Sequence, residues 1–381
     1  MPMSFPGSPA ALLQELIRIP SVNPDCAVGQ GATGEWACSV RVGEILEACG
    51  AGVTFDEVMP GRPNVIGRFP GGNGKPGLLF APHTDTVSVQ GMSIDPFGGE
   101  IRDGKIYGRG ASDTKGTMAA MLWALHELRE EIPRLSSAVT FVGLMGEEAG
   151  QPGSIHFASR YGDQFDFALV GEPTSLETVY AHKGCVWLRL STKGRSCHGS
   201  TPERGINAIR LLIPLLEELL KHLESRLPDY ADPVLGLPTV SLGLLQGGSS
   251  PNIVPAECHA TLDFRETPAL FAAGGSRRLV EVFLAGKGLS DQIEVTVVGD
   301  SCPLLTDPQT DGIRRLQSIG SRLTTAPWFC DAGRLAGGGI PSVACGPGNI
   351  AQAHTKDEFL TVTDLEAGAD FYRQFLETYR V

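Results

Sequence analysis

The first 180 residues alternate between apolar segments with the periods of strands and of helices. Ser8 to Ile19 predicts an amphipathic helix, because Ser8 can cap it and Pro9 suits the first helical position. Lys115–Glu131 predicts a longer helix with Met and Leu side chains on one side, and Gly71–Pro76 predicts a hairpin turn. The predicted strands are 64–68, 77–81, 105–107, 138–144 and 167–170. This alternation predicts an α/β fold, a mixed sheet with helices on both faces.

A second pattern begins at Ala181 and continues to about Gly299. Its elements follow the order β-α-β-β-α-β, the split-βαβ (ferredoxin-like) arrangement of a two-layer module. The predicted strands are 186–191, 239–245, 256–265 and 293–298, and the predicted helices are 205–226 and 277–285. The remaining predicted elements are helices 312–323 and 363–379 and strand 341–345. We therefore expect a first domain formed by 1–180 and 300–381, with 181–299 inserted as a second domain.

Charge and cysteine content restrict the possible functions. The net charge of −12 disfavours a nucleic-acid partner, which would require a basic surface. The nine cysteines are scattered without a Cys-x-x-Cys pair, a distribution typical of reduced thiols in a cytosolic protein. Met1–Pro9 lacks a basic region followed by an apolar stretch, and no apolar run is long enough to span a bilayer. We expect a cytoplasmic protein without a nucleic-acid or membrane partner.

Candidate chemistry begins just after the predicted strand 77–81. His83 and Asp85 follow this strand in the segment Ala-Pro-His-Thr-Asp-Thr, and their spacing lets the Asp85 carboxylate reach the far imidazole nitrogen. Such a carboxylate fixes the orientation of a metal-binding histidine. A turn with solvated polar side chains explains this segment equally well when it is taken alone.

Two further acidic segments adjoin predicted elements. Asp113 stands just before a predicted helix, where it could bridge two cations or simply cap the helix. Glu147 and Glu148 follow an apolar strand, and two adjacent carboxylates are costly unless a nearby charge offsets theirs. A metal site would offset it, with one glutamate as ligand and its neighbour as proton acceptor, whereas an exposed polar loop is the alternative.

The last two segments supply Glu172, at the end of a strand, and His354, after a glycine-rich turn. Together the five segments place two histidines and several carboxylates at the carboxyl ends of strands, where open α/β folds bind ligands. Nitrogen and oxygen donors without thiolate suit zinc, cobalt or manganese, and such mixed sets are typical of catalytic metal sites.

In this order and spacing, the five segments resemble the dinuclear zinc metallopeptidase and deacylase family of acetylornithine deacetylase, succinyl-diaminopimelate desuccinylase, aminoacylase and glutamate carboxypeptidase. The resemblance covers essentially the whole chain. It implies a zinc-peptidase-like catalytic domain and an inserted lid that also forms a homodimer. It further implies two divalent cations, zinc first, with cobalt or manganese as alternatives. The metal ligands carried over from the family are His83, Asp113, Glu148, Glu172 and His354.

Within that resemblance, His83 and Glu172 hold one cation, Glu148 and His354 hold the other, and Asp113 bridges both. Water held between the cations loses its proton to Glu147, attacks an amide carbonyl as hydroxide, and Glu147 then delivers the proton to the leaving amine. Asp85 supports the site as a catalytic residue. The family also predicts a cis peptide bond between Asp113 and Thr114, which is otherwise rare.

The inserted domain carries candidates of its own. By the resemblance, His198 crosses to the partner subunit and stabilises the tetrahedral oxyanion, although a plain loop histidine is the alternative. Asn252 and Arg265 match residues that bind the backbone carboxylate of the substrate, and Arg265 suits a bidentate grip.

The substrate is the most open question. Glutamate at position 172 and the segments around it look most like acetylornithine deacetylase, which implies a small-molecule N-acyl amino acid such as N-acetylornithine. Trp328-Phe329-Cys330-Asp331 stands where desuccinylases carry Gly-Thr-Ser-Asp, which disfavours a succinyl-diaminopimelate substrate and favours a more apolar pocket. A carboxypeptidase or dipeptidase would use the same metals. A non-catalytic binding protein would have lost a ligand or the base, and all six positions are filled here.

Overall fold

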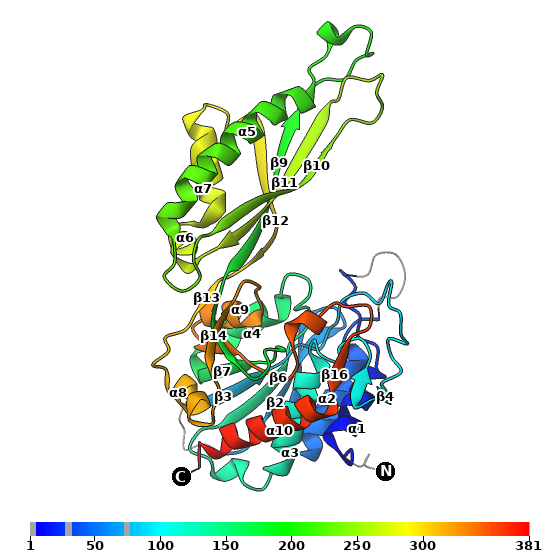
Figure 1. Ribbon diagram of the computed structural model, residues 1–381, viewed down its shortest axis with the longest axis vertical. Helices are drawn as coiled ribbons and strands as arrows, with labels where there is room; N and C mark the ends of the chain where they lie inside the picture. The colour runs from blue at the N-terminus through cyan, green and yellow to red at the C-terminus, as the bar shows by residue number, and fades with distance from the viewer. Residues whose placement is uncertain (1–4, 27–32, 72–76, 381) are drawn as a thin grey trace. The chain divides into compact units, whose positions relative to one another are not determined.

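The computed structural model describes residues 5–26, 33–71 and 77–380, which form two compact units (Figure 1). Unit 1 comprises Met1–Tyr180, Leu305–Thr325 and Cys330–Val381, and unit 2 comprises Ala181–Leu304 and Ala326–Phe329. Unit 2 thus continues to Leu304 and takes in a short later segment, whereas the predicted insertion comprised 181–299. Most of the hairpin turn predicted at 71–76 lies outside the described residues.

Unit 1 is built on a nine-stranded mixed sheet with the strand order β1-β2-β6-β3-β7-β15-β8-β13, in which β14 also pairs with β8. Its strands are β1 (Gly52–Met59), β2 (Arg62–Arg68), β3 (Gly77–Ala81), β6 (Val139–Gly143), β7 (Phe165–Val170), β8 (Thr178–His182), β13 (Leu304–Leu305), β14 (Leu323–Ala326) and β15 (Ser342–Ala344). The central strands β6, β3, β7 and β15 run parallel, and β1 and β2 are antiparallel additions at one edge. β3, β6 and β15 are buried along their whole length, and β7 is buried except at Asp166, as expected for strands covered on both faces.

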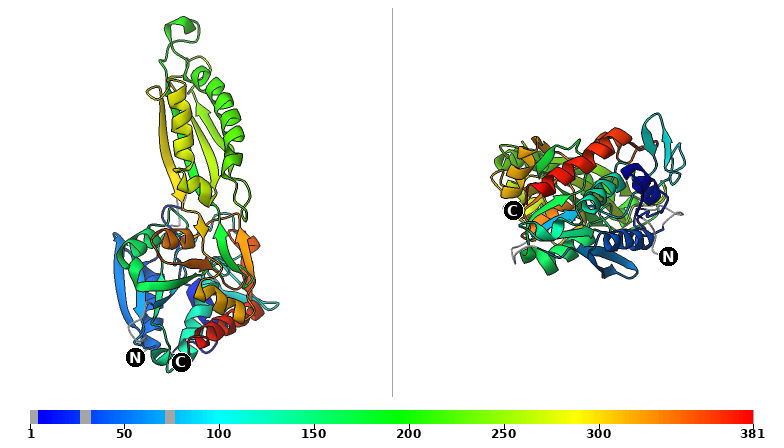
Figure 2. Two further views of the ribbon diagram at one scale, coloured as in Figure 1. Left: turned by 90° about the vertical axis from the view of Figure 1, so that its left-hand side faces the viewer. Right: turned by 90° about the horizontal axis from the view of Figure 1, so that it is seen from below.

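Helices cover this sheet, and the alternation of strands and helices confirms the predicted α/β class. The helices of unit 1 are α1 (Pro9–Ile17), α2 (Trp36–Ala48), α3 (Lys115–Glu127), α4 (Pro152–Tyr161), α8 (Asp311–Ser318), α9 (Asp331–Gly337) and α10 (Val362–Glu377). A separate three-stranded sheet contains β4 (Glu100–Arg102), β5 (Lys105–Tyr107) and β16 (Phe359–Thr361). Helices α3 and α10 pack against each other and lie below the sheet in the view of Figure 1, and Figure 2 shows α10, in red, from two further sides. Their apolar sides form one core with α1, α2 and the strands.

Two local predictions can be compared directly with the structure. Ser8 caps α1, since its hydroxyl accepts a hydrogen bond from the amide of Ala11. The helix predicted at 312–323 is too long, because α8 ends at Ser318. Gly320 follows with φ of 95°, a left-handed conformation that ends helices, and β14 begins three residues later.

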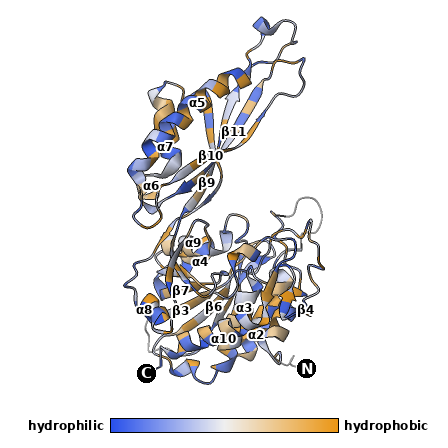
Figure 3. Ribbon diagram, in the orientation of Figure 1, coloured by the Kyte–Doolittle hydropathy of each residue, from blue (hydrophilic) through white to orange (hydrophobic). Residues whose placement is uncertain are grey.

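Unit 2 is an antiparallel four-stranded sheet with the strand order β10-β11-β9-β12. Its elements are β9 (Gly184–Lys193), α5 (Ala208–Arg226), β10 (Thr239–Gly247), β11 (Glu257–Glu266), α6 (Pro268–Ala272), α7 (Gly275–Gly286) and β12 (Ile293–Ser301). The β-α-β-β-α-β order is therefore confirmed. Helices α5 and α7 bury leucine and phenylalanine side chains against one face of the sheet, and α5 shows alternating hydrophilic and hydrophobic bands (Figure 3).

Short 3-10 helices connect several of these elements, at Ile132–Arg134, Gly162–Gln164, Pro202–Arg204, Leu227–Tyr230 and Ile350–Gln352. Among the residues that the structure describes, no helix combines the length and the apolar character needed to cross a bilayer.

Candidate metal centre

The adjacent parallel strands β6, β3 and β7 direct three candidate segments to the same edge of the sheet. His83 follows the end of β3, Glu147 and Glu148 follow β6, and Glu172 follows β7. Because the carboxyl ends of parallel strands meet at one edge, residues that lie far apart along the chain converge there. His83 and Glu172 are buried, in contrast to the solvated turns that each segment alone would allow.

Asp113 lies at the centre of this group. Its Oδ1 is 3.1 Å from Nε2 of His83, and its Oδ2 is 3.3 Å from Nε2 of His354. The same nitrogen of His354 lies 3.1 Å from a carboxylate oxygen of Glu148. The two oxygens of one buried carboxylate therefore face two different imidazoles, which is the geometry required of a bridging ligand.

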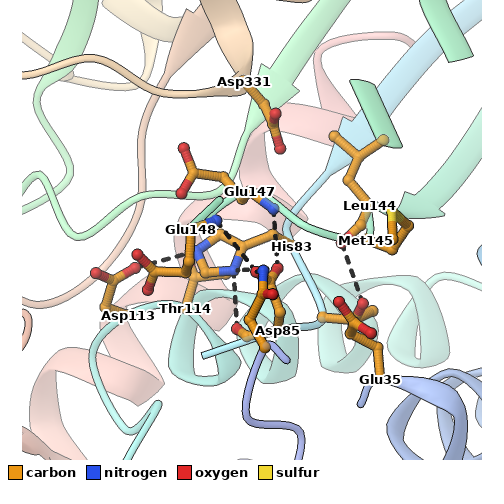
Figure 4. Close-up of polar contacts among 12 residues, drawn as sticks. Glu35, His83, Asp85, Asp113, Thr114, Leu144, Met145, Glu147, Glu148 and Asp331 are labelled. Carbon is orange, nitrogen blue, oxygen red and sulfur yellow. Dashed lines mark hydrogen bonds and ion pairs between the residues drawn. The ribbon is translucent and has the colours of Figure 1, made fainter. Parts of the chain in front are cut away.

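Metal-ligand atoms of His83, Asp113 and Glu148 all lie within 4.8 Å of one another, which makes these residues a possible metal site. Figure 4 shows these three side chains gathered together, with Glu147 beside them and Asp331 on the far side of Glu147. His354 joins the group through its contacts with Asp113 and Glu148.

Hydrogen bonds from distant segments hold Asp113 in place. Glu358 accepts hydrogen bonds from the amides of Ser112 and Asp113, at 2.9 and 3.0 Å. The hydroxyl of Thr114 donates to the carbonyl oxygen of Gly171, at 2.6 Å, and so ties this turn to the end of β7. The Asp113–Thr114 peptide bond is cis, as predicted. Sequence reasoning assigned no role to Glu358, although its place at the end of the His354 segment was a signal.

Asp85 connects the histidine with the two glutamates. Its carboxylate accepts hydrogen bonds from the backbone amides of Glu147 and Glu148, each at 3.1 Å, and from the Asn23 side chain at 2.8 Å. The Asp85 carboxylate also reaches the far imidazole nitrogen of His83, as predicted. Nδ1 of His83 is 3.4 Å from Oδ1 of Asp85 and 3.0 Å from the Asp85 carbonyl oxygen.

The carboxylates of the site have unusual acidities. Burial, followed by the charge of Asp331, raises the pKa of Glu147 well above its usual range. Burial and the charge of Asp113 do the same for Glu172, and they raise the pKa of Glu148 to about 7. Buried negative charges this close together are unfavourable unless positive charge accompanies them. The donor set therefore fits divalent cations.

The two histidines respond to the same carboxylates in the opposite sense. Burial alone would lower the pKa of His83, but its hydrogen bonds with Asp113 and Asp85 outweigh burial and raise the pKa. Hydrogen bonds with Asp113 and Glu148 raise the pKa of His354 to about 10. His354 also has a positive φ of 62°, which is uncommon for a residue with a side chain and is compatible with a functional constraint.

Glu147 differs from its neighbour in its contacts. Its Oε1 accepts a hydrogen bond from Nε2 of Gln151 at 3.1 Å, and it does not belong to the three-residue group that could hold a metal ion. Asp331, which begins α9, is buried, and burial raises its pKa to about 6 although Ser154 donates a hydrogen bond to it. Gln151 and Asp331 were not predicted as site residues, because only the tertiary fold brings α4 and α9 to the glutamates.

Three candidate residues lie in unit 2. His198 pairs with Ile253 through an isolated β-bridge, and the amide of Gly199 donates to the carbonyl oxygen of Asn252 at 2.8 Å. His198 and Asn252 are therefore neighbours. Arg265 lies on β11, where Asp263 holds its guanidinium at 3.1 Å.

The sheet and the buried histidine and carboxylate side chains at its edge define the class of protein, a metal-dependent hydrolase. The chain belongs to the peptidase family M20/M25/M40, whose model matches residues 79–378. It is accordingly an enzyme that acts on linear amides.

Several curated relatives are named acetylornithine deacetylase. Acetylornithine deacetylase from Yersinia pestis is 30% identical over 324 residues, which cover 82% of each chain. The protein of that name from Proteus mirabilis is 30% identical over 349 residues, covering 88% of this chain and 87% of the relative. That from Photorhabdus laumondii is 32% identical over 314 residues, covering 80% and 79%.

Solved structures share the fold. A metallo-carboxypeptidase of the M20 family from Sulfolobus solfataricus superposes with a TM-score of 0.77, at 20% identity, over 97% of this chain and 98% of that one. A tripeptidase from Staphylococcus aureus gives 0.74 at 23% identity, over 97% of both chains. A dinuclear metal binding peptidase of the M20 family from Bacillus subtilis gives 0.67 at 15% identity, over 97% and 96%.

Proposed function

We propose that this enzyme removes an N-acyl group, in the first place acetyl, from an amino acid such as N-acetylornithine. The observation that carries the proposal is the position of Asp113, whose two carboxylate oxygens face His83 and His354. The relatives named acetylornithine deacetylase, which align over about four fifths of the chain or more, support the choice of substrate.

Two divalent cations complete the site in this proposal. His83 and Glu172 would hold one, Glu148 and His354 would hold the other, and Asp113 would contribute to both. When bound, such cations lower the pKa of a shared water and polarise the amide carbonyl. Zinc suits this nitrogen and oxygen donor set, and cobalt or manganese would also fit it.

The protein side chains transfer the proton and position the reacting groups. Glu147 takes a proton from the attacking water and delivers it to the leaving amine, a role that suits a carboxylate whose raised pKa brings it nearer to neutrality. Asp85 fixes the backbone that carries Glu147 and Glu148, because its two oxygens accept hydrogen bonds from both amides.

Unit 2 supplies the contacts with the substrate in this proposal. His198 stabilises the negative oxygen that develops on the attacked carbonyl. Asn252 and Arg265 bind the carboxylate of the amino acid, and Asp263 holds the Arg265 guanidinium in one orientation for that purpose. Phe329 also lies against this guanidinium, with the ring centre 5.7 Å from Cζ. Its ring would offer an apolar surface to the side chain or acyl group of the substrate.

A homodimer through unit 2 belongs to the same proposal. β10 is the edge strand of its sheet, and Leu242, Leu244 and Leu245 on it are 39%, 55% and 47% exposed. An exposed apolar edge strand invites pairing with another strand. A second copy of the chain would cover these leucines, and His198 would then act in the partner's site.

A cytoplasmic location completes the proposal. All nine cysteines are free thiols, which is typical of proteins in a reducing compartment.

The test is ninhydrin-detected release of amine from N-acetylornithine, from other N-acyl amino acids and from dipeptides. We expect turnover of an N-acetyl amino acid that zinc, cobalt or manganese supports and that a chelator abolishes. Cleavage of dipeptides without any deacylation would contradict the proposed substrate and favour a peptidase, the activity named for the tripeptidase and carboxypeptidase of the same fold. Turnover unaffected by chelator would contradict the metal centre.

A further inference from the structure

Gln151 occupies an unusual position beside Glu147. It is 1% exposed, has a left-handed φ of 62° and directly precedes α4. Its backbone amide donates to the carbonyl oxygen of Gly146 at 3.0 Å, which closes the loop that carries both glutamates. Its side chain turns inward, where Nε2 donates to Oε1 of Glu147 at 3.1 Å. A left-handed backbone is costly for glutamine, so this loop is held by its surroundings.

Arg334 determines which end of the Gln151 amide faces Glu147. Nε of Arg334, on α9, donates to Oε1 of Gln151 at 3.2 Å. A guanidinium can only donate hydrogen bonds, so it must face the amide oxygen. The NH2 end is then directed at the Glu147 carboxylate, where it too can only donate. The chain Arg334, Gln151 and Glu147 therefore has a single consistent direction of hydrogen bonding.

The helices that carry this chain are packed together. α4 and α9 are in contact, and the single hydroxyl proton of Ser154 on α4 is within reach of two acceptors, the carbonyl oxygen of Gln151 and the carboxylate of Asp331 at the start of α9. The two helices thus fix Gln151 from both sides.

We infer that Gln151 is a positioning residue for the general base and that Arg334 acts through Gln151. This inference rests on the proposed role of Glu147 as proton acceptor. A donor on Oε1 fixes the plane of the carboxylate and leaves Oε2 to receive the proton. Without that donor, the carboxylate rotates about its last torsion angle and loses the geometry that proton transfer requires.

The intervening amide also separates the charge of Arg334 from Glu147. A neutral donor orients the carboxylate without adding a full positive charge.

The test compares Gln151→Ala, Arg334→Ala, Arg334→Lys and the double variant Gln151→Ala/Arg334→Ala. Arg160→Ala is the matched control, because Arg160 lies on α4 in an exposed ion pair with Asp56. For each protein, kcat and KM are measured on the best substrate of the wild type, with metal content and Tm alongside. A crystal structure of Gln151→Ala reports the Glu147 conformation independently of activity.

We expect Gln151→Ala to lower kcat by about 10- to 100-fold, with KM within about twofold and metal content unchanged. Arg334→Ala should lower kcat less, and Arg334→Lys should restore much of it, because lysine is also only a donor. The double variant should be no slower than Gln151→Ala, since Arg334 acts through that residue. In the crystal structure of Gln151→Ala, the Glu147 carboxylate should have rotated away from the position that it occupies in the wild type.

Unchanged kcat in Gln151→Ala, or effects of the two alanine substitutions that simply multiply, would overturn the inference. A fall in Tm without a change in kcat would show a purely structural role. These results are separable from failure of the proposed function. If the wild type cleaves dipeptides and not N-acyl amino acids, the proposed substrate fails, while the same comparison on a dipeptide still tests Gln151.

Discussion

Two carboxylates of the metal centre are each held by an amide side chain that an arginine orients. Arg62 donates to Oδ1 of Asn23 at 3.1 Å, and Asn23 in turn donates to Asp85. Arg334 and Gln151 repeat this arrangement at Glu147. Because arginine cannot accept a hydrogen bond, each amide has one permitted orientation. Both carboxylates therefore receive a fixed donor that carries no full charge.

Glu147 and Glu148 are adjacent in the chain, yet their surroundings imply different tasks. Glu148 contacts His354, whereas Glu147 contacts Gln151. We predict that Glu147→Gln lowers kcat by about 10²- to 10⁴-fold, because the amide cannot take up a proton, while the protein keeps its metal. Amine release and metal analysis by mass spectrometry measure the two effects.

Glu148→Gln is the control for this prediction, since it should lose metal as well as activity. If Glu147→Gln lost its metal to the same degree, Glu147 would be a ligand and not the base.

At the scale of elements, Glu358 holds the turn before α3 from the far end of the chain. Its buried carboxylate pairs with Arg109 at 2.6 Å and accepts hydrogen bonds from the amides of Ser112 and Asp113. We predict that Glu358→Ala lowers the free energy of unfolding by about 3–5 kcal/mol, because it leaves a buried arginine without its partner. Urea denaturation of the metal-free protein measures this change.

Asp311→Ala is the matched comparison, because the Asp311–Arg315 pair lies at the surface of α8. It should cost no more than about 1 kcal/mol. Equal effects of the two substitutions would show that Glu358 contributes no more than an exposed ion pair.

The segments that meet at the sheet edge also predict how stability depends on pH. The pKa of Glu148 is raised to about 7 and that of Asp331 to about 6. The folded metal-free protein therefore binds more protons than the unfolded chain, and its stability falls as the pH rises through these values. The lowered pKa values of Asp85 and Asp113 change stability only at more acidic pH.

We predict that Tm of the chelator-treated protein falls by several degrees between about pH 5 and pH 8, and that added zinc reduces this fall. Thermal unfolding followed by circular dichroism measures it. Asp331→Asn should make the dependence shallower, because it removes one of the raised carboxyl groups. A metal-free protein whose Tm rises over this range would contradict the assignment.

Sequence periodicity was sufficient for the elements that bury a regular apolar face. The predicted strand 77–81 coincides with β3, and the predicted helix 205–226 contains α5. Periodicity missed β1, whose residues are mostly exposed. It also predicted a helix at 312–323, which continues past Gly320, whereas α8 ends at Ser318. Apolar periodicity carries little information where a segment is exposed, and by itself it takes no account of a helix-stop glycine such as Gly320.

The site residues likewise divide into those that the sequence could predict and those that it could not. Residues next to strand ends could be proposed from the sequence, because a strand end has a known place in a sheet. Gln151 and Asp331 could not be proposed, because only the packing of α4 and α9 brings them to the glutamates. No local pattern encodes that packing.

At the scale of the whole molecule, the local sequence pattern also could not predict that the chain returns to unit 2 after leaving it. Ala326–Phe329 belongs to unit 2, where Trp328 lies near His182 and Phe329 lies near Arg265. A segment of four residues has too little periodicity to reveal its neighbours. The aromatic residues were noticed as a departure from the desuccinylases, and the structure shows which side chains they contact.

The proposed dimer gives the prediction that concerns the whole assembly. Leu244→Arg places a charge on the exposed edge strand β10, which should separate the subunits at a cost in activity but not in metal content. Analytical ultracentrifugation measures the molecular mass in solution and so distinguishes dimer from monomer. A wild-type protein that sediments as a monomer with full activity would exclude a role for His198 across subunits.

A mixing experiment decides whether His198 acts in its own subunit or in the partner. Glu147→Gln and His198→Ala proteins are each nearly inactive if both residues are needed. In a hybrid dimer, the subunit that keeps Glu147 would receive an intact His198 from its partner, so one of the two sites would be complete. Unfolding and refolding the two variants together should therefore restore activity if His198 crosses. If it acts within its own subunit, every site in the hybrid carries a defect and the mixture stays inactive.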